Sequence, residues 1–347
     1  GTGAAPPYTV TTFYDELSSG LVDVTGQVFG WFRADSSSTW YEGTSNGIGE
    51  DGRARDFVRE MVQKADAAGV DFSSFDGNGD GYVDVLAVVH PLEDGACIGS
   101  THLWAHRSGV WPPEPTNDGV QVVDYILQSA VGGPACDETQ AMSIGTFSHE
   151  LGHGFGLPDL YDYSMEGSGI GHWGLMGSGN WNRQSSPAHM MAWTKDQLGW
   201  IAIDTIIAGT VLGSRTLQPV INNPLALRME SVSDANTYFL FENRQQIGSD
   251  QHLSSPGLLI WHIDDSARLD HGNHSKPYGV ALEQADGLGN LDNNANRGDA
   301  GDPYPGSTGN TAYTNTSLPD SKNNDGTDSR VRITGITPSG QNVSFVY

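Results

Sequence analysis

Two histidines four residues apart, with a glutamate directly after the first, form the part of the sequence best suited to metal chemistry. His149 and His153 would lie one turn apart on the same face of a helix, so their imidazoles can converge on one ion. Imidazole nitrogens are common ligands of Zn²⁺. Glu150 would flank that face, where a carboxylate can accept a proton from a metal-activated water. The alternative is a surface helix with two solvated histidines.

The residues after the second histidine predict a third ligand. Gly156 lies three residues past His153, where the chain must leave the helix, and glycine accepts the positive φ that a reversing turn requires. That turn would bring Asp159 back towards the metal, whereas the nearby Asp162 and Glu166 do not fall at the same offset. Three protein ligands leave the fourth position open for water, as in catalytic zinc sites. Asp159 could instead cap a turn or contact one of the histidines.

Helices and strands with clear periodicity surround this motif and must position it. Helical periodicity and end signals predict three helices, over residues 53–69, 141–155 and 187–198. Apolar runs predict three strands, over residues 82–90, 103–107 and 120–127. The region 8–32 is predicted to form a short helix or turn followed by strands. The metal motif would therefore lie on a helix that packs against a sheet.

The character of the sequence changes after Trp200. Short β-rich runs such as 237–242 and 258–263 alternate with loops rich in Asn, Asp and Gly, and no long helical pattern recurs. We therefore predict an α+β protein of two domains. Residues 1–202 would form a catalytic domain with a mixed twisted sheet and an active-site helix, and residues 203–347 a mainly β C-terminal domain.

The chain is strongly acidic, and this excludes several classes of partner. Its 17 Lys and Arg against 42 Asp and Glu give a formal net charge of −25. Such a surface repels phosphate backbones and anionic lipids, so we expect no nucleic-acid partner. No apolar run approaches the roughly 18 residues of a membrane span, so we expect no membrane insertion. Solvation and the binding of divalent cations are better reasons for the excess of acid.

An acidic loop rich in glycine precedes the first predicted strand and predicts a calcium site. Oxygen ligands would come from alternating positions of this loop, Asp76, Asn78, Asp80, Tyr82 and Asp84. The sixth position is Gly81, as in an EF-hand loop, but the twelfth is Ala87 rather than a bidentate glutamate. The loop is therefore not an EF-hand, and it could also be an acidic turn without an ion. A weaker pattern of the same kind comprises Asp292, Asn294, Asn296, Asp299 and Asp302.

The chain contains two cysteines, Cys97 and Cys136, both in loop-like surroundings. Two remote loop thiols in such a chain predict one disulfide formed in an oxidising compartment, although two free buried thiols would also fit. We therefore expect a secreted, extracellular protein. Since the chain starts at Gly1 rather than Met, we expect that a signal segment and a pro-segment have been removed and that this is the mature form.

At this point the chain resembles the immune inhibitor A family of secreted bacterial metallopeptidases, relatives of the metzincins. The segments that carry the resemblance lie along most of the chain, at residues 149–162, 174–181, 192–200, 241–244, 257–264 and 284–287. The resemblance implies a metzincin-like zinc endopeptidase with bound calcium and an N-terminal pro-segment. Asp159 departs from the metzincin pattern, which has histidine as the third ligand.

A methionine between glycines follows the metal motif. In several zinc peptidases such a turn forms an apolar floor under the metal ligands, and Met176 in the segment Trp173–Gly179 is the candidate for this role. Ordinary core packing would also explain a buried methionine.

The sequence as a whole favours a secreted zinc endopeptidase that acts on proteins or peptides, and we expect a monomer. Zinc would polarise the scissile carbonyl, while Glu150 accepts the proton of the water and passes it to the leaving amine. The rival is a binding or adhesion protein with a structural or inactive zinc site, and another hydrolase on the same metal is a third possibility. Glu150 distinguishes the peptidase from a protein with a structural zinc site, because a structural site needs no acid in that place.

Overall fold

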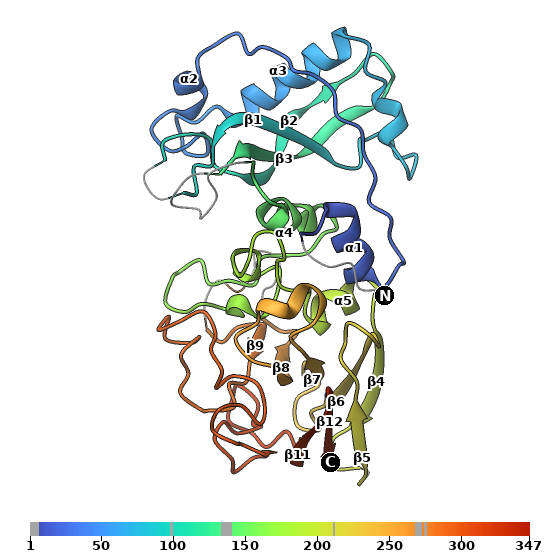
Figure 1. The fold of residues 1–347 in the computed structure, drawn as a ribbon, viewed down its shortest axis with the longest axis vertical. Helices are drawn as coiled ribbons and strands as arrows, with labels where there is room; N and C mark the ends of the chain where they lie inside the picture. Colours follow the sequence, from blue (N-terminus) through green and yellow to red (C-terminus); the bar gives the residue numbers. More distant parts are fainter. Residues whose placement is uncertain (1–6, 98–99, 133–140, 211, 268–272, 274–275) are drawn as a thin grey trace. The chain divides into compact units, whose positions relative to one another are not determined.

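A computed structural model describes residues 7–347 apart from 98–99, 133–140, 211, 268–272 and 274–275. The chain forms two compact units (Figure 1). The small unit comprises Thr25–Gly156, and the large unit comprises Gly1–Val24 together with Leu157–Tyr347.

The small unit is built on a three-stranded mixed sheet. Its strands are β1 (Leu86–Glu93), β2 (His106–Pro115) and β3 (Gln121–Val131). The central strand β3 pairs in parallel with β1 and antiparallel with β2. Its helical segments are α2 (Ser38–Glu42), α3 (Ala54–Ala67), η1 (Phe72–Phe75) and α4 (Ile144–Gly154). Figure 1 shows α3 on one face of this sheet and α4 on the other.

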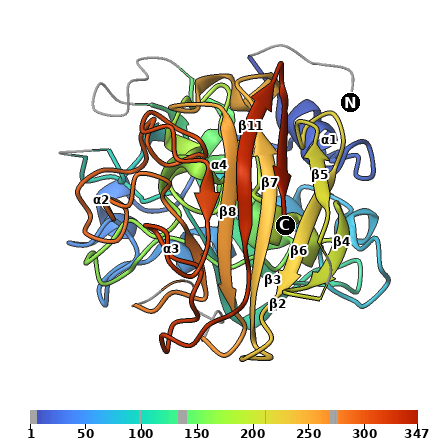
Figure 2. The ribbon, with the colours of Figure 1, turned by 90° about the horizontal axis from the view of Figure 1, so that it is seen from below.

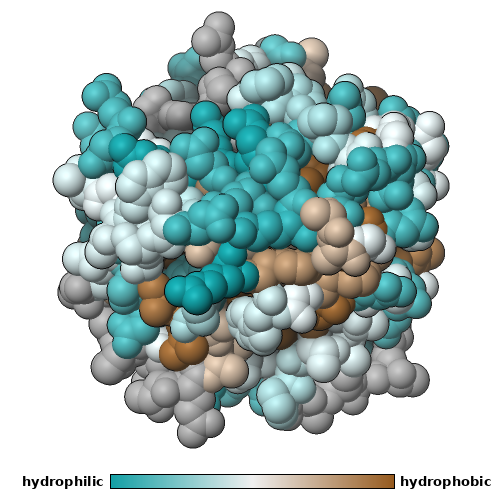
Figure 3. All heavy atoms as spheres, turned by 90° about the horizontal axis from the view of Figure 1, so that it is seen from above, coloured by the Kyte–Doolittle hydropathy of each residue, from teal (hydrophilic) through white to brown (hydrophobic). Residues whose placement is uncertain are grey.

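The core of the small unit lies between α3 and the sheet. Val58 of α3 is buried together with Tyr125 and Leu127 of β3, and Val62 of α3 is buried together with Val122 of β3. The period of the apolar residues along α3 is helical, so one stripe of its side chains faces the sheet. The outer face on the side of α2 and α3 is mostly hydrophilic, with a band of less polar residues across it (Figure 3).

The predicted strands of the small unit exist, but two of them begin later than expected. Residues 82–85 do not join β1, because Tyr82 makes only an isolated bridge with Gln121 and the N–H of Asp84 donates to the Phe75 carbonyl at 2.8 Å. β2 begins at His106 rather than 103. Apolar residues at the start of these two predicted strands therefore lie in loops, although the sequence pattern indicates a strand there.

The large unit contains two sheets that share one hydrophobic core. Five strands pair in the order β4-β6-β7-β8-β9, and four in the order β10-β11-β12-β5. Their bounds are β4 (Ala202–Ile207), β5 (Ser214–Leu217), β6 (Leu225–Glu230), β7 (Thr237–Arg244), β8 (Gly257–Asp264), β9 (Val280–Leu282), β10 (Ala312–Tyr313), β11 (Ile333–Ser339) and β12 (Asn342–Val346). Phe241 and Ile260 of the first sheet pack in one cluster with Ile336 and Phe345 of the second. Figure 2 shows β11 crossing in front of β7 and β8.

The remaining elements of the large unit are short helical segments. They are α1 (Val10–Ser18), η3 (Gly171–Trp173), η4 (Gly179–Trp181), α5 (Ala192–Gln197) and η5 (Gly248–His252). The Thr9 side chain caps α1 by accepting from the Thr12 N–H at 3.2 Å, which satisfies one of the free donors of the first turn. The strands predicted to follow this helix, up to residue 32, are absent from the structure. No helix among the described residues is long and apolar enough to cross a membrane.

The helix predicted over 187–198 is shorter in the structure and begins at Ala192. Its first residues are extended because their backbone groups have partners outside a helix. The Ala188 N–H donates to the Gly179 carbonyl at 3.0 Å, and the His189 N–H donates to the Asp250 carboxylate at 2.9 Å. Tertiary hydrogen bonds thus prevent the helix from beginning at Pro187, although proline is common at the first position of a helix.

The compact units divide the chain at other positions than the predicted boundary after residue 202. Two segments that precede that boundary bind to the β-rich part of the large unit. Glu16 of α1 accepts from the Ser249 N–H at 2.9 Å, and Arg244 of β7 donates to the Trp173 carbonyl at 3.0 Å. Packing therefore places α1 and residues 157–201 with the C-terminal sheets.

Candidate metal centre

The helix α4 carries the two histidines of the metal motif. It packs against β3 and β2 of the small unit, and His149 and Glu150 are buried on it. The helix ends at Gly154, and Gly156 follows with φ +89 while its N–H donates to the His153 carbonyl at 2.9 Å. This is the left-handed conformation that glycine adopts at little cost after a helix. The chain therefore turns directly after the second histidine.

Three potential ligands converge within one continuous segment, residues 149–159. His149, His153 and Asp159 each offer one ligand atom, and these atoms all lie within 4.8 Å of one another. The two imidazole rings are perpendicular, with centroids 5.0 Å apart. Two nitrogen ligands and one oxygen ligand fit Zn²⁺ in a site with three protein ligands and one open position.

Glu150 lies beside the first histidine and is 8% exposed. Its carboxylate is not one of the three converging ligand atoms. A carboxylate that lies near a metal ion without coordinating it can accept or donate protons.

Two tyrosines accompany Asp159, and the sequence reasoning missed them. The Tyr163 hydroxyl donates a hydrogen bond to Asp159 Oδ2, and the Tyr161 ring packs edge-on against Tyr163 with centroids 5.1 Å apart. Burial, followed by the charge of Asp159, raises the pKa of Tyr161, so its hydroxyl stays protonated at neutral pH. Their positions in the sequence, two and four residues after Asp159, could have indicated that they lie near this carboxylate.

The neighbouring carboxylates have other surroundings. Asp162 accepts from the N–H groups of Ser164 and Gly167 at 2.7 and 2.9 Å, and from the Tyr278 hydroxyl at 2.8 Å. Glu166 is exposed. Asp162 therefore holds a turn of the large unit together, and Asp159 is the acid that converges with the histidines.

The turn around Met176 is buried and closely packed. The Met176 carbonyl accepts from the Leu160 N–H at 2.7 Å, next to Asp159 in sequence. A Cβ on Gly179 would lie 2.5 Å from the Gly174 carbonyl oxygen, so a glycine is needed there for close approach of the backbone. The turn is thus tied to the segment that follows the candidate ligand, and the role of Met176 as an apolar floor stays a prediction.

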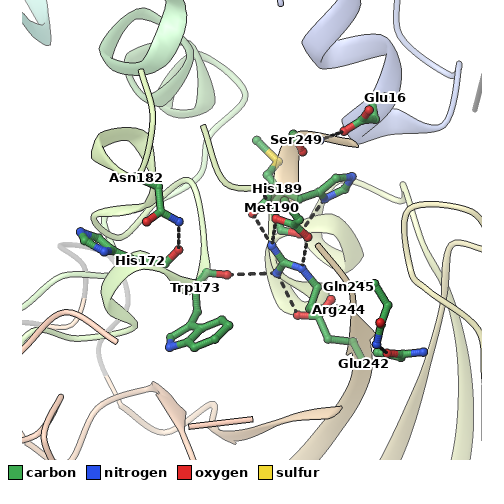
Figure 4. A network of polar contacts seen from close by, with 12 residues as sticks. Glu16, His172, Trp173, Asn182, His189, Met190, Glu242, Arg244, Gln245 and Ser249 are labelled. Carbon is green, nitrogen blue, oxygen red and sulfur yellow. Dashed lines mark hydrogen bonds and ion pairs between the residues drawn. The ribbon is translucent and has the colours of Figure 1, made fainter. Parts of the chain in front are cut away.

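A fully buried arginine fixes the start of that turn (Figure 4). Arg244 makes a bidentate pair with Asp250 at 2.5 and 2.6 Å, and donates to the carbonyls of Trp173 and His189 at 3.0 and 3.2 Å. Glu242 lies 3.4 Å from the same guanidinium. A planar fork of five donors suits this role, because buried charge must be paired and hydrogen-bonded. The network anchors the Trp173 segment to β7.

The predicted calcium loop is held by its own side chains. Asp76 accepts from the N–H groups of Gly79, Asp80 and Gly81 at 2.8, 3.1 and 2.9 Å, and Asp84 accepts from that of Gly77 at 3.0 Å. In the part of the chain that the structure describes, the acidic residues of this loop do not form a converging group of three. Calcium binding by Asp76, Asn78, Asp80, Tyr82 and Asp84 therefore stays a prediction.

Calcium should raise the unfolding temperature of the chain if this loop binds it. Three carboxylates in one loop repel each other without a cation, and a ligand that binds only the folded state stabilises it by mass action. At about 100 times the dissociation constant the stabilisation is about 2.7 kcal/mol. Thermal melts in excess calcium and in a calcium-selective chelator measure the difference, and Asp80→Ala should remove part of it. Superimposable melts would leave an acidic turn without an ion.

The two cysteines can be described only in part. Cys97 is buried, and Cys136 lies outside the described residues. The predicted bridge between Cys97 and Cys136 is best tested chemically.

Thiol titration of the denatured, unreduced protein should find no free sulfhydryl. The reason is that two loop cysteines of a protein exposed to an oxidising compartment pair with each other. The reduced protein provides the control and should give two thiols per chain. Two thiols without reduction would refute the bridge and weaken the case for secretion.

Other histidines have structural surroundings. Burial lowers the pKa of His90 and of His172 to about 4, with nearby His102 and Arg297 contributing to the respective shifts. Both are therefore neutral at physiological pH.

Comparison with known proteins identifies the class. The chain is 28% identical over 220 residues to the pre-pro-metalloprotease PrtV of Vibrio cholerae, a match that covers 54% of this chain and 23% of the relative. It is 30% identical over 197 residues to immune inhibitor A of Bacillus thuringiensis subsp. alesti, covering 50% of this chain and 28% of the relative. The matches thus span about a quarter of the length of these relatives. The class that the comparisons define is the metallopeptidases.

Within that class, the chain belongs to the immune inhibitor A peptidase M6 family, whose catalytic-domain model matches residues 5–201. The family predicted from the motifs is therefore confirmed. The matched region ends next to the predicted boundary after residue 202.

Proposed function

We propose that the chain is a secreted zinc-dependent endopeptidase that hydrolyses peptide bonds with Glu150 as the general base. The observation that supports this most strongly is the convergence of His149, His153 and Asp159 in a chain whose family is a peptidase family. Residues 1–202 would form the catalytic domain, and residues 203–347 a β-rich C-terminal domain.

Each residue of the motif has a distinct task in this proposal. The imidazoles of His149 and His153 and the carboxylate of Asp159 would hold the ion. When bound, zinc would act as a Lewis acid on the scissile carbonyl and on the attacking water. Glu150 would accept the proton of that water and donate it to the leaving amine. Tyr163 would orient the Asp159 carboxylate by its hydrogen bond to Oδ2.

The proposed substrates are proteins or peptides, and the proposed location is extracellular. A net charge of −25 makes nucleic acids poor partners. We also propose that the chain acts as a monomer and that calcium is a second, structural cofactor.

A binding or adhesion protein with a structural or inactive zinc site is the alternative. The buried Glu150 beside His149 favours the enzyme, because a structural zinc site usually has four protein ligands and no separate acid.

Zinc content and casein hydrolysis, measured on the same sample, test the proposal. We expect about one zinc per chain, as in single-metal peptidases, and hydrolysis that a chelator abolishes and added zinc restores. Stoichiometric zinc without hydrolysis would support the binding protein, and hydrolysis unaffected by metal removal would contradict the proposal.

A further inference from the structure

A cavity of about 240 Å³ lies on the α3 side of the small unit's sheet. Its lining comes from the loop at residues 47–52, from the start of α3, and from His106, Ser108 and Tyr125 on β2 and β3. Ser108 lies opposite Tyr125 in the antiparallel pair, so both side chains are on the face where Tyr125 packs in one cluster with α3. Figure 1 shows α4, the helix of the metal motif, on the other face. The cavity is therefore not part of the candidate metal centre.

The charge of the cavity lining differs from that of the chain. Arg55, Arg107 and His106 line the cavity, and none of its described lining residues is acidic, although the chain has 42 Asp and Glu against 17 Lys and Arg. The Arg107 guanidinium is already paired with Asp124. Among the described residues, the Arg55 side chain donates only to Ser108 Oγ, at 3.4 Å. Arg55 lies in the first turn of α3, where a positive charge opposes the helix dipole, so helix stability does not explain it.

The hydrogen bonds in the cavity wall leave Arg55 as its main free donor. Burial, together with the charge of Arg55, lowers the pKa of His106, so the ring is neutral at pH 7. The Trp104 carbonyl, 2.7 Å from Nδ1, can only accept, so Nδ1 carries the proton and Nε2 accepts from the Tyr125 hydroxyl at 3.0 Å. His106 and Tyr125 therefore satisfy each other. The donors left for a ligand are the Arg55 guanidinium and the Ser108 hydroxyl.

We propose that this cavity binds a carboxylate group of a peptide or protein, with Arg55 as the principal contact. A guanidinium presents parallel N–H donors that match the two oxygens of a carboxylate, and such bidentate pairs are strong. The cavity is smaller than the roughly 300–1,000 Å³ of sites for drug-sized ligands, so it fits the end of one residue. Ile48 lines the cavity and is 55% exposed, and it would contact the methylene groups next to the carboxylate.

Charge favours a carboxylate over a phosphate. Arg55 is the one cation of the described lining without an acidic partner, because Arg107 is paired and His106 is neutral. A phosphate dianion beside a single guanidinium would keep one negative charge uncompensated, whereas a carboxylate would keep none. The net charge of −25 also repels a dianion more strongly than a monoanion. Binding at this cavity would need neither the metal nor peptidase activity.

NMR of the full chain with ¹³C-labelled histidine tests the site, since the charge of Arg55 acts on the His106 ring. The His106 signal is assigned by its loss in His106→Gln. Two probes carry a carboxylate: N-acetylglycine has that of a chain end, and the α-amide of N-acetylaspartate has that of an acidic side chain. Both should shift the His106 signal, and the probe that binds more tightly identifies the source. Neutral N-acetylglycinamide should leave the signal unchanged.

Two variants on the same helix separate the site from general charge effects. Arg55→Gln should weaken carboxylate binding about 10–100-fold, the effect of losing hydrogen bonds to a charged group. Arg59→Gln makes the same change one turn further along α3, at an arginine that already has Glu114 as a partner at 2.8 Å. This control should bind the carboxylates as the parent does. Circular dichroism should show that both variants are folded.

Three results would overturn the site. They are a His106 shift of equal size with the neutral amide, a carboxylate affinity that is unchanged in Arg55→Gln, and no shift with either carboxylate in the parent protein. Inorganic phosphate that binds more tightly than both carboxylates would overturn the assignment to a carboxylate.

Discussion

Glu150→Gln should lower peptide hydrolysis by at least about 10²–10⁴-fold, the range expected for the loss of a general base. Glutamine has nearly the same shape but cannot accept the proton of the attacking water. Zinc content should not change, because Glu150 is not among the three converging ligand atoms. Initial rates of casein hydrolysis and metal analysis of the same preparation provide the two readouts.

The control for this variant is Glu166→Gln, which makes the same chemical change at an exposed acid outside the converging group. It should hydrolyse casein at the parental rate. If Glu150→Gln also cleaves at nearly the parental rate, Glu150 is not the base and the proposed mechanism is wrong.

Asp159→Ala should lose both zinc and activity. The substitution removes the oxygen ligand and leaves two imidazoles, which hold zinc much less firmly than three ligands do. Loss of a residue that only orients a ligand typically lowers metal affinity about 10–100-fold, so removal of a ligand should exceed that range. Zinc analysis after dialysis against a weak chelator measures the occupancy.

Asp162→Asn is the matched control, because Asp162 binds Ser164, Gly167 and Tyr278 rather than converging with the histidines. This variant should keep its zinc, even if it unfolds at a lower temperature. Full zinc retention in Asp159→Ala would assign the third ligand to another residue and leave Asp159 as a turn residue.

The local part of the site could be predicted from sequence for a physical reason. Helical spacing alone sets His149 and His153 on one face, and the structure has α4 over Ile144–Gly154 within the predicted range. Gly156 adopts the positive φ that the reversal requires. These features depend on neighbours a few residues apart, and backbone geometry determines such relations.

Contacts between distant segments could not be predicted in the same way. Arg244 donates a hydrogen bond to the Trp173 carbonyl, and the two residues are 71 positions apart in the chain. The sequence around either residue gives no indication of this contact. Asp286 joins Asp299 and Asp302 only because of the path of an irregular loop. The start of the helix at Ala192 depends likewise on the bond between the His189 N–H and Asp250. Tertiary hydrogen bonds thus determine where the structure departs from the elements that local sequence patterns predict.

Anomalous diffraction at the zinc absorption edge, from crystals of the purified protein, would test the central claim most directly. We predict a strong peak contacted by His149, His153 and Asp159, at about 2.0–2.2 Å, with no fourth protein ligand. A peak elsewhere, or one at the histidines with a fourth protein side chain in place of an open position, would contradict a catalytic zinc site in this motif.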